Sequence, residues 1–408
     1  MPATSFAGPS LVFDVKTGRV IAHDRAGEPW YPASLTKLMT AYVVFQKIRA
    51  GKLKLDQKIP VSFFATTQPP SKIGLKVGNE VTVDFALQAL LVYSANDMAY
   101  VLAEGASGTM VNFVSEMNAQ AKRLGLTSTN YANPNGLFDP RQISTARDIG
   151  ILAATLLAEF PEHNRYFAQG FVQAGNRKLP NRNSLLRLMK DADGMKTGFV
   201  CNSGFNLVAS ATRNGQRLVA IVLGDRSGKA RTGTAQKLLL DGFAQMPSPQ
   251  SVLLAQLPND PLGAVVPADM TETVCKGKPL VAAVSAKELA GWGVSFGTYD
   301  TAVIADKALR GRLIGAAGLA APGDTGVVRM PGPSNYAAMI WNIDQSASLS
   351  LCARYRAENA VCDVMTPQSF QRIAALAPEP PAPVVKASAQ GSDAGKSKKK
   401  KRRVRKKY

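Results

Sequence analysis

A helix that is apolar on nearly all of its sides is the feature that most restricts how this chain can fold. Pro32 favours a first helical turn, and the residues after it predict a helix from about Ser34 to Ile48. The apolar positions of this helix are Leu35, Leu38, Met39, Ala41, Tyr42, Val43, Val44 and Phe45. Such a helix must be buried among other elements, so the chain needs a domain large enough to enclose it.

Strand patterns stand before and after this helix. Ser10 to Val15 and Arg19 to His23 predict one hairpin, and residues 203–212 and 217–223 predict another around Asn214-Gly215. Helical patterns cover residues 83–93, 97–104, 110–124, 144–157 and 230–243. This order predicts an α+β domain whose antiparallel sheet is completed by strands from both ends of the segment.

Length and proline content divide the chain further. With 408 residues we expect two or three domains. We predict a first domain at 1–246, a Pro-rich linker at 247–282, a small second domain at 283–372 and a disordered tail at 373–408. The tail is first proline-rich and then basic.

The positive charge of the chain is concentrated in its tail. Residues 391–408 hold ten Lys or Arg against one Asp, and so supply +9 of the net charge of +20. We expect this tail to contact anionic envelope polymers or lipid head groups, in a way that added salt weakens. No basic fold pattern interleaved with aromatic residues precedes it, so specific nucleic-acid binding is not expected.

The cysteines and histidines do not predict a metal site. Cys201, Cys275, Cys352 and Cys362 match no zinc spacing, and the only histidines, His23 and His163, lie far from them in sequence. Cys352 and Cys362 form a disulfide if the protein is exported, and otherwise two buried thiols. No apolar run is long enough for a transmembrane helix.

The first residues show no export signal. Residues 1–9 lack both a charged segment and an apolar one. Either the protein is cytoplasmic, or the given start lies downstream of a real signal.

Ser34 and Lys37 are the first candidates for chemistry. Positions i and i+3 share one face of a helix, so a hydroxyl and an amine would lie side by side at its N-terminus. Burial lowers the pKa of a lysine, which can then act as a base and activate the serine. The plain alternative is a capping serine and a surface lysine.

Two further short motifs follow in order. Ser94-Ala95-Asn96 lies between two helical patterns, where a loop can project a hydroxyl and an amide. Lys196-Thr197-Gly198 precedes the C-terminal hairpin and is predicted to lie on a strand, where the glycine permits close approach of another backbone. An S-x-x-K, then an S-D-N, then a K-T-G motif is the set shared by penicillin-binding proteins and class A β-lactamases. Here the middle triplet is S-A-N, which keeps the serine and the asparagine of that motif.

With these motifs the chain resembles the low-molecular-mass D-alanyl-D-alanine carboxypeptidases, peptidase family S11, over about residues 8–245. Further matching segments are Tyr31 to Thr40, Asn133 to Leu137, Ser144 to Asp148, Asn181 to Asn183 and Asp193 to Gly198. The resemblance implies a serine β-lactamase/transpeptidase-like fold, with a helical subdomain beside the sheet. It also implies an enzyme without metal or cofactor that acts on peptidoglycan stem peptides and is acylated by β-lactams.

The resemblance assigns a role to each motif residue. It makes Ser34 the nucleophile and Lys37 the general base, assisted by Ser94 and Asn96. Lys196, Thr197 and Gly198 would bind the substrate and its terminal carboxylate, and the backbone amides of Ser34 and Phe199 would form the oxyanion hole. One departure is Val200, where the family commonly has a polar residue, which leaves the polarity of the cleft open.

The second domain repeats a strand–helix pattern. Strands at 291–299 and 336–341 precede helices at 301–313 and 346–356, and a strand follows at 360–365. This pattern, with Trp292 to Tyr299, resembles the SPOR domain, a small α/β domain that binds glycan strands stripped of their stem peptides.

Two other functions remain to be separated from the carboxypeptidase. A serine β-lactamase of the same fold needs a glutamate to activate water, and the nearest candidates are Glu159 and Glu162. The other alternative is a catalytically inactive peptidoglycan-binding protein. Because peptidoglycan lies outside the cytoplasmic membrane, the chemistry favours a periplasmic or secreted protein whose given start lies downstream of its signal.

Overall fold

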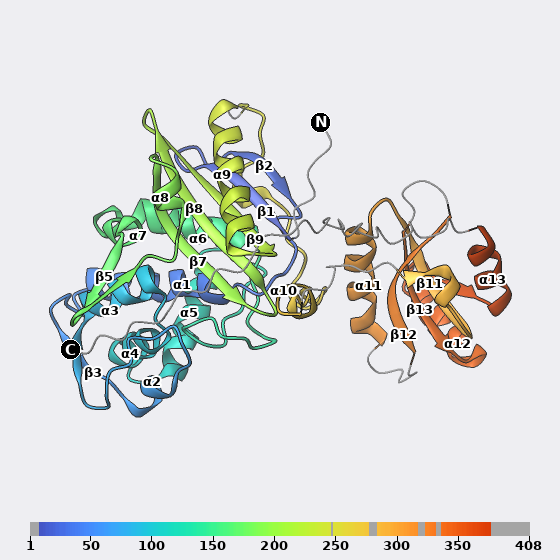
Figure 1. Cartoon of the computed structure of the whole chain (residues 1–408), viewed down its shortest axis with the longest axis horizontal. Helices are drawn as coiled ribbons and strands as arrows, with labels where there is room; N and C mark the ends of the chain where they lie inside the picture. Colours follow the sequence, from blue (N-terminus) through green and yellow to red (C-terminus); the bar gives the residue numbers. More distant parts are fainter. Residues whose placement is uncertain (1–7, 246–247, 277–283, 317–322, 332–335, 377–408) are drawn as a thin grey trace, which may run out of the picture.

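The computed structural model describes residues 8–245, 248–276, 284–316, 323–331 and 336–376. The start at 1–7 and the basic tail from 377 onward lie outside the described residues. Figure 1 shows a larger unit built around one sheet and a smaller one around a second sheet. Helix α13 (Pro367–Leu376) extends the smaller unit past the predicted boundary at 372.

The sheet of the larger unit is antiparallel throughout. It consists of β1 (Ser10–Asp14), β2 (Val20–Asp24), β7 (Ala192–Val200), β8 (Gly204–Arg213) and β9 (Gln216–Asp225), in the order β2-β1-β9-β8-β7. The N-terminal strand β1 pairs with the C-terminal strand β9, so the predicted α+β sheet is confirmed. Among the described residues, strand β7 forms an edge of the sheet and pairs only with β8.

The strands are apolar on both faces, so helices cover both sides. Leu11 and Phe13 of β1 belong to one core and Val12 to another, as the twofold alternation of a strand requires. Helices α8 (Leu185–Leu188) and α9 (Gly228–Ala244) lie over the Val12 side. Helices α1 (Lys37–Arg49) and α6 (Ala146–Glu159) cover the other side.

Helix α1 is the buried helix expected after Pro32. A 3₁₀ turn, Ala33–Thr36, precedes it, and every residue from Lys37 to Phe45 is buried. The surrounding helical subdomain contains α2 (Phe63–Thr67), α3 (Val83–Gln88), a π-helical turn (Ala89–Tyr93), α4 (Asn96–Ser107), α5 (Met110–Arg123) and α7 (Arg165–Ala168). The sequence patterns did not predict its two small two-stranded sheets, β3 (Lys58–Pro60) with β4 (Glu80–Thr82) and β5 (Phe171–Ala174) with β6 (Arg177–Pro180).

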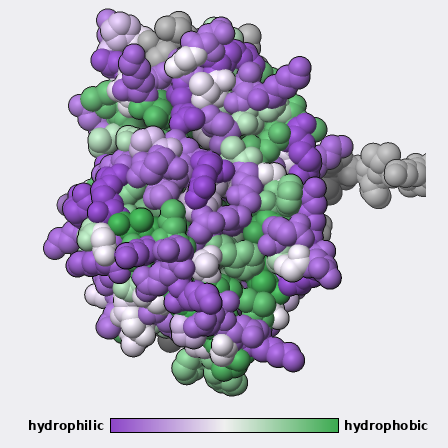
Figure 2. All heavy atoms as spheres, turned by 90° about the vertical axis from the view of Figure 1, so that its left-hand side faces the viewer, coloured by the Kyte–Doolittle hydropathy of each residue, from purple (hydrophilic) through white to green (hydrophobic). Residues whose placement is uncertain are grey.

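The outer surface of this subdomain is mostly polar. Figure 2 views the molecule from the side on which β3, α3 and β5 lie in Figure 1, and hydrophilic residues separate the apolar patches there. Among the described residues, we find no helix with the length and apolarity needed to span a bilayer.

Residues 248–276 correct the prediction of a linker. They contain a 3₁₀ turn at Leu254–Gln256 and a short helix, α10 (Thr271–Val274). Leu254, Leu257 and Met270 are buried in the core of the larger unit. The proline-rich composition hides this packing, because the buried residues occur singly and with no period.

The smaller unit combines five strands with three helices among its described residues. The elements are β10 (Val284–Ser285), β11 (Trp292–Tyr299), α11 (Ala302–Ala316), β12 (Asp324–Arg329), β13 (Tyr336–Ile343), α12 (Gln345–Ala357), β14 (Asp363–Met365) and α13. Without β10 and α13, this is a split βαβ arrangement with the order β12-β13-β11-β14. Helices α11 and α12 cover one sheet face, and Phe370 of α13 packs on the other against Met339 and Trp341.

The cysteines form two disulfides. Cys352 pairs with Cys362 within the smaller unit, which decides between the two alternatives left by the sequence. Cys201 pairs with Cys275 across a sequence separation of 74 residues, and no spacing rule predicted this bond.

Candidate active site

Ser34 lies in the 3₁₀ turn that leads into α1. Asn206 on β8 holds the chain just before it, since its side-chain amide donates to the carbonyls of Tyr31 at 2.9 Å and Pro32 at 3.2 Å. The oxygen of the same side chain accepts from Gly224 N at 2.8 Å. The sheet therefore fixes the position of the turn that carries the serine.

Lys37 points from the first turn of α1 to Ser34. Its Nζ lies 2.9 Å from Ser34 Oγ, 2.8 Å from Asn96 Oδ1 and 2.5 Å from the carbonyl oxygen of Asn135. A neutral amine has two N–H donors and one lone pair. The two carbonyl oxygens can accept both N–H bonds, so the lone pair is left for the proton of Ser34.

Burial makes Lys37 a usable base near neutral pH. The side chain is fully buried, and this desolvation lowers its pKa to about 7, against a smaller opposing effect of Asp97. Asp97 is itself held by the backbone amides of Ile73 and Gly74. A lysine with a pKa near ambient pH can both accept and return a proton.

The second motif joins the two lysines. Ser94 ends the π-helical turn in a left-handed conformation, φ 67°, and its Oγ accepts from Lys196 Nζ at 2.9 Å. Asn96 begins α4 and accepts from Lys37, while its own amide donates to the Pro69 carbonyl at 2.9 Å. The motif therefore lies between the base and the third motif.

The third motif lies on β7, as predicted. Lys196 is buried, and desolvation followed by repulsion from Lys37, Arg231 and Arg182 holds its pKa well below the ordinary lysine value. A Cβ at Gly198 would lie 2.9 Å from the Pro32 carbonyl oxygen and 3.3 Å from Leu35 N. Glycine thus lets β7 pass close to the serine turn.

Ser34, Ser94, Asn96, Thr197 and Gly198 line one cleft, and the buried Lys37 and Lys196 are hydrogen-bonded to Ser34 and Ser94 in its wall. It has a volume of about 510 Å³ and is lined by Ser34, Pro70, Ser71, Ser94, Asn96, Gly136, Leu137, Arg182, Thr197, Gly198, Phe199, Val200, Cys201, Phe205 and Arg231. The described residues of the lining include two arginines and no carboxylate. An anionic ligand therefore suits the cleft.

Arg231 is a cleft residue that the motifs did not reveal, and Arg182 lies in the matching segment Asn181 to Asn183 but was given no role there. Arg231 comes from α9, donates to the carbonyls of Gly198 and Asn206, and keeps a buried Nε without a partner. Burial lowers its pKa to about 10, with Asp225 opposing, so it remains a cation at neutral pH. Arg182 follows β6 and stacks on Tyr93. No short-range pattern marks Arg231, because only the packing of α9 on β8 brings it to the cleft.

Gly136 is a site position where alanine should not fit. Its φ is +80°, and a Cβ would lie 1.9 Å from the carbonyl oxygen of Ala33. We expect Gly136→Ala to destabilise the protein by about 2–3 kcal/mol, because it adds a strained φ and a backbone clash beside Ser34. Urea unfolding measures this. Gly170→Ala is the matched control, since a Cβ there meets nothing within 4 Å, and an equal loss in both variants would contradict the expectation.

In the part of the chain that the structure describes, no group of three or more His, Cys, Asp or Glu side chains could hold a metal ion.

Comparison with known proteins agrees with this geometry. Residues 2–227 match the family model described as D-alanyl-D-alanine carboxypeptidase, Peptidase S11. The chain is 38% identical over 240 residues to the D-alanyl-D-alanine carboxypeptidase DacC of Escherichia coli, covering 57% of this chain and 60% of that protein. It is 32% identical over 244 residues to DacF of Bacillus subtilis, covering 59% and 62%. The chain thus spans about three fifths of the length of these relatives.

Solved structures show the same likeness. Penicillin-binding protein 5 of Haemophilus influenzae superposes with a TM-score of 0.58 at 36% identity, over 60% of this chain and 72% of that one. Penicillin-binding protein D2 of Listeria monocytogenes, solved in its cefotaxime-bound form, gives a TM-score of 0.55 at 30% identity, over 60% and 100%. The predicted transpeptidase-like fold is confirmed, and the chain belongs to the D-alanyl-D-alanine carboxypeptidase family, peptidase family S11.

Proposed function

We propose that this protein is a serine-type D-alanyl-D-alanine carboxypeptidase that removes the terminal D-alanine from peptidoglycan pentapeptide stems. The observation that carries the proposal is the environment of Lys37. Asn96 Oδ1 and the Asn135 carbonyl oxygen can accept the two N–H bonds of the neutral amine, and Ser34 Oγ lies 2.9 Å from the same nitrogen. Family membership supports the same chemistry.

The reaction begins with acylation of Ser34. Lys37 takes the Ser34 proton as Oγ attacks the carbonyl carbon of the penultimate D-alanine, and the backbone amides of Ser34 and Phe199 bind the resulting oxyanion. The C–N bond then breaks, and Ser94 relays to the departing amine of D-alanine the proton that Lys37 took from Ser34, which returns Lys37 to its neutral form. Asn96 keeps Lys37 oriented. Water, deprotonated by Lys37, hydrolyses the ester and restores the Ser34 hydroxyl.

Lys196, Thr197, Gly198 and Arg231 form the carboxylate end of the cleft. An extended peptide can pair with the free edge of β7 at Gly198, which brings its C-terminal carboxylate to Lys196 and the Thr197 hydroxyl. Arg231 lies behind Gly198 with an unpartnered Nε. The charge of the substrate therefore meets the cationic end of the cleft.

Arg231→Ala tests this end of the cleft. We expect kcat/KM to fall about 10- to 100-fold, because a charge-assisted hydrogen bond contributes about 1.5–3 kcal/mol. Steady-state release of D-alanine measures the change. Arg213→Ala removes an equal charge from β8, where Arg213 pairs with Asp191, and should leave the rate unchanged. Equal losses in both variants would contradict a role for Arg231 in substrate binding.

The pH dependence follows from Lys37. Only the neutral amine accepts the serine proton, so the acylation rate should rise with pH through about 7, the pKa that burial imposes on Lys37. An ordinary lysine would place this limb near its usual pKa of 10.5. The rate of acylation by penicillin, measured from pH 5 to about 10, gives the midpoint. A midpoint above about 9 would exclude Lys37 as the base.

A β-lactamase of the same fold receives no support from the two candidate glutamates. Glu159 accepts from Tyr42 and Gln46 at the far end of α1, and Glu162 pairs with Arg49 at the surface. Neither lines the cleft. Neither glutamate can therefore activate a water molecule in the cleft for fast hydrolysis of a β-lactam ester.

The decisive test of the proposed function uses a pentapeptide stem ending in D-alanyl-D-alanine. We expect release of one equivalent of D-alanine and a tetrapeptide, measured by mass spectrometry. The same stem with a terminal L-alanine is the control. If the protein releases no D-alanine from the pentapeptide, the result would instead support the alternative of a catalytically inactive peptidoglycan-binding protein.

We also propose that the smaller unit is a SPOR-like domain that binds glycan strands without stem peptides. Its split βαβ topology supports this. Such a substrate, together with the stem peptide, implies a periplasmic or secreted protein. Co-sedimentation with sacculi tests the binding, and we expect more protein to bind after an amidase has removed the stem peptides. Equal binding before and after this treatment would contradict the proposal.

The basic tail at 391–408 remains a proposed contact for anionic envelope polymers or lipid head groups. Binding to anionic vesicles should fall steeply between low salt and about 0.5 M salt. Binding that does not respond to salt would contradict it.

A further inference from the structure

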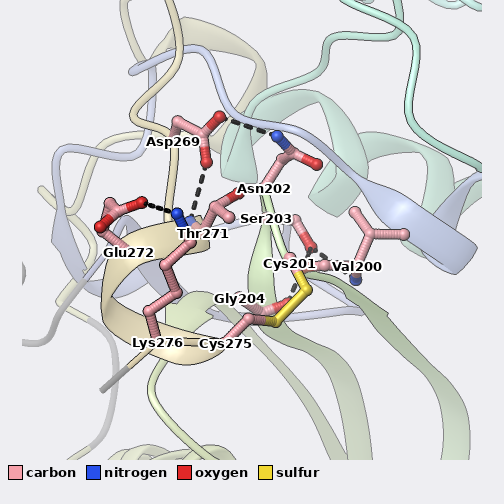
Figure 3. The surroundings of a disulfide bond; sticks show 10 residues. All are labelled: Val200, Cys201, Asn202, Ser203, Gly204, Asp269, Thr271, Glu272, Cys275 and Lys276. Atoms are coloured by element: carbon pink, nitrogen blue, oxygen red, sulfur yellow. Dashed lines mark hydrogen bonds and ion pairs between the residues drawn. A yellow bond between two sulfur atoms is a disulfide. The ribbon is translucent and has the colours of Figure 1, made fainter. Parts of the chain in front are cut away.

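The disulfide between Cys201 and Cys275 joins the mouth of the cleft to a segment far along the chain. Cys201 is the first residue after β7 and itself lines the cleft. Cys275 follows α10. We call residues 269–275 the strap. Figure 3 shows the strap lying over the turn between β7 and β8, with the disulfide at one end.

Hydrogen bonds attach the strap at its other end. Met270 N donates to the Asn202 carbonyl at 3.0 Å, and Asn202 Nδ2 donates to Asp269 Oδ2 at 2.7 Å. The second oxygen of Asp269 accepts from Thr271 N at 2.8 Å, which begins the turn of α10. The turn after β7 is therefore held both covalently and by hydrogen bonds (Figure 3).

The strap is itself firmly seated. Met270 is completely buried in the core of the larger unit. Val266, shortly before the strap, also contacts α11 of the smaller unit, because its carbonyl oxygen accepts a hydrogen bond from Arg310. Arg310 in turn pairs with the buried Glu28 of the larger unit at 2.7 Å. A segment anchored in this way can hold the turn in place rather than follow its motion.

The end of β7 needs such support. Strand β7 is an edge strand, and its last residues pair only with the start of β8, Phe199 with Phe205 and Val200 with Gly204. Phe199 is 42% exposed, and its backbone amide is the proposed oxyanion donor. The carbonyl oxygen of the turn residue Ser203 also accepts a hydrogen bond from Trp30 Nε1 at 2.9 Å, and Trp30 is close in sequence to Ser34. Small shifts of this turn would displace the donor from the reacting carbonyl.

We propose that the Cys201–Cys275 disulfide is a positioning element of the active site, which fastens the strap to the turn after β7 and so fixes Phe199 and Val200 at the cleft. This inference rests on the proposed function, because it assigns the two cysteines a part in acylation. Neither cysteine is a catalytic residue, since the sulfur atoms act through the backbone of β7.

The chain contains its own matched control. The double variant Cys201→Ser/Cys275→Ser removes the tether, and Cys352→Ser/Cys362→Ser removes the other disulfide, which lies in the smaller unit. Both are made in the full chain and assayed well below their unfolding midpoints. The readouts are the rate of acylation by a fluorescent penicillin, and kcat and KM for a tripeptide ending in D-alanyl-D-alanine. Acylation rates and kcat are divided by the concentration of active sites, which is the amount of protein that penicillin labels when the reaction is complete.

We expect the first variant to acylate about tenfold more slowly, with kcat lowered more than KM is raised, because a displaced oxyanion donor weakens the transition state. The second variant should stay within about twofold of the wild type. If the disulfide only stabilises the fold, its removal would lower the unfolding midpoint and leave the acylation rate per active site unchanged. That result in the first variant would overturn the proposal.

A second variant decides the matter if the double serine variant does not fold. Asn202→Ala keeps the disulfide and removes the side-chain bond to Asp269. It should lower the acylation rate about threefold, whereas Lys276→Ala, which removes only the ion pair with Glu272, should not. Equal rates in these two variants would overturn the inference that the strap fixes the turn after β7. Inactivity of the wild type in the same series would instead mark failure of the proposed function.

Discussion

Replacement of Ser34 by alanine is expected to lower D-alanine release by about 10⁴-fold or more and to abolish covalent labelling by penicillin. Besides Ser34, the described lining of the cleft contains the hydroxyls of Ser71 and Ser94. Both already accept a hydrogen bond from a basic side chain, Ser94 from Lys196 at 2.9 Å and Ser71 from Arg182 at 3.4 Å. Mass spectrometry of the intact protein and steady-state kinetics measure the two effects.

The contrast with Ser94→Ala makes this prediction specific. That variant keeps the nucleophile and loses only the proton relay, so it should still be labelled, with a rate lowered about 10²-fold. If Ser34→Ala retained labelling, the nucleophile would have to be another residue, and the assignment of this cleft would be wrong.

Lys37→Ala should have an effect almost as large. It removes the base and also leaves the Asn96 and Asn135 oxygens without their donor, so we expect acylation to slow by about 10³- to 10⁴-fold. Stopped-flow labelling with a fluorescent penicillin measures the rate. The remaining activity should no longer show the midpoint near 7 that burial of Lys37 produces in the wild type.

Lys47→Ala is the control for the loss of a lysine from the same helix. Lys47 lies toward the other end of α1 and pairs with Glu116 at 2.8 Å. Its removal should leave acylation within about twofold of the wild type. A comparable loss in both variants would show that α1 had been disturbed as a whole, and would contradict a specific role for Lys37.

The local patterns of the sequence predicted the parts of the site that depend on short-range order. Ser34 and Lys37 are close in sequence, and the structure places them in the 3₁₀ turn and at the first residue of α1. Their proximity and the strand that carries Lys196 follow from periodicity and turn residues within a few positions. The hairpin around Asn214-Gly215 is equally local, and the structure joins β8 to β9 there. In each case the interacting residues are neighbours in the chain.

Features that depend on long-range packing could not be predicted in this way. Arg231 reaches the cleft only because α9 packs on β8, and Cys201 meets Cys275 only because Met270 of the strap is buried in the core of the larger unit. The strap was expected to be a linker, since its few buried residues have no period. The strands β3 to β6 are short, and their pairing depends on contacts with the helical subdomain.

The most direct test of the central claim is to locate the penicillin adduct and follow its lifetime. The protein is mixed with penicillin, and samples taken over time are digested and analysed by mass spectrometry. The arrangement of Ser34, Lys37 and Lys196 predicts one adduct, on the peptide that contains Ser34, formed rapidly and lost slowly. An adduct on any other residue, or rapid turnover of penicillin without an accumulating adduct, would contradict it.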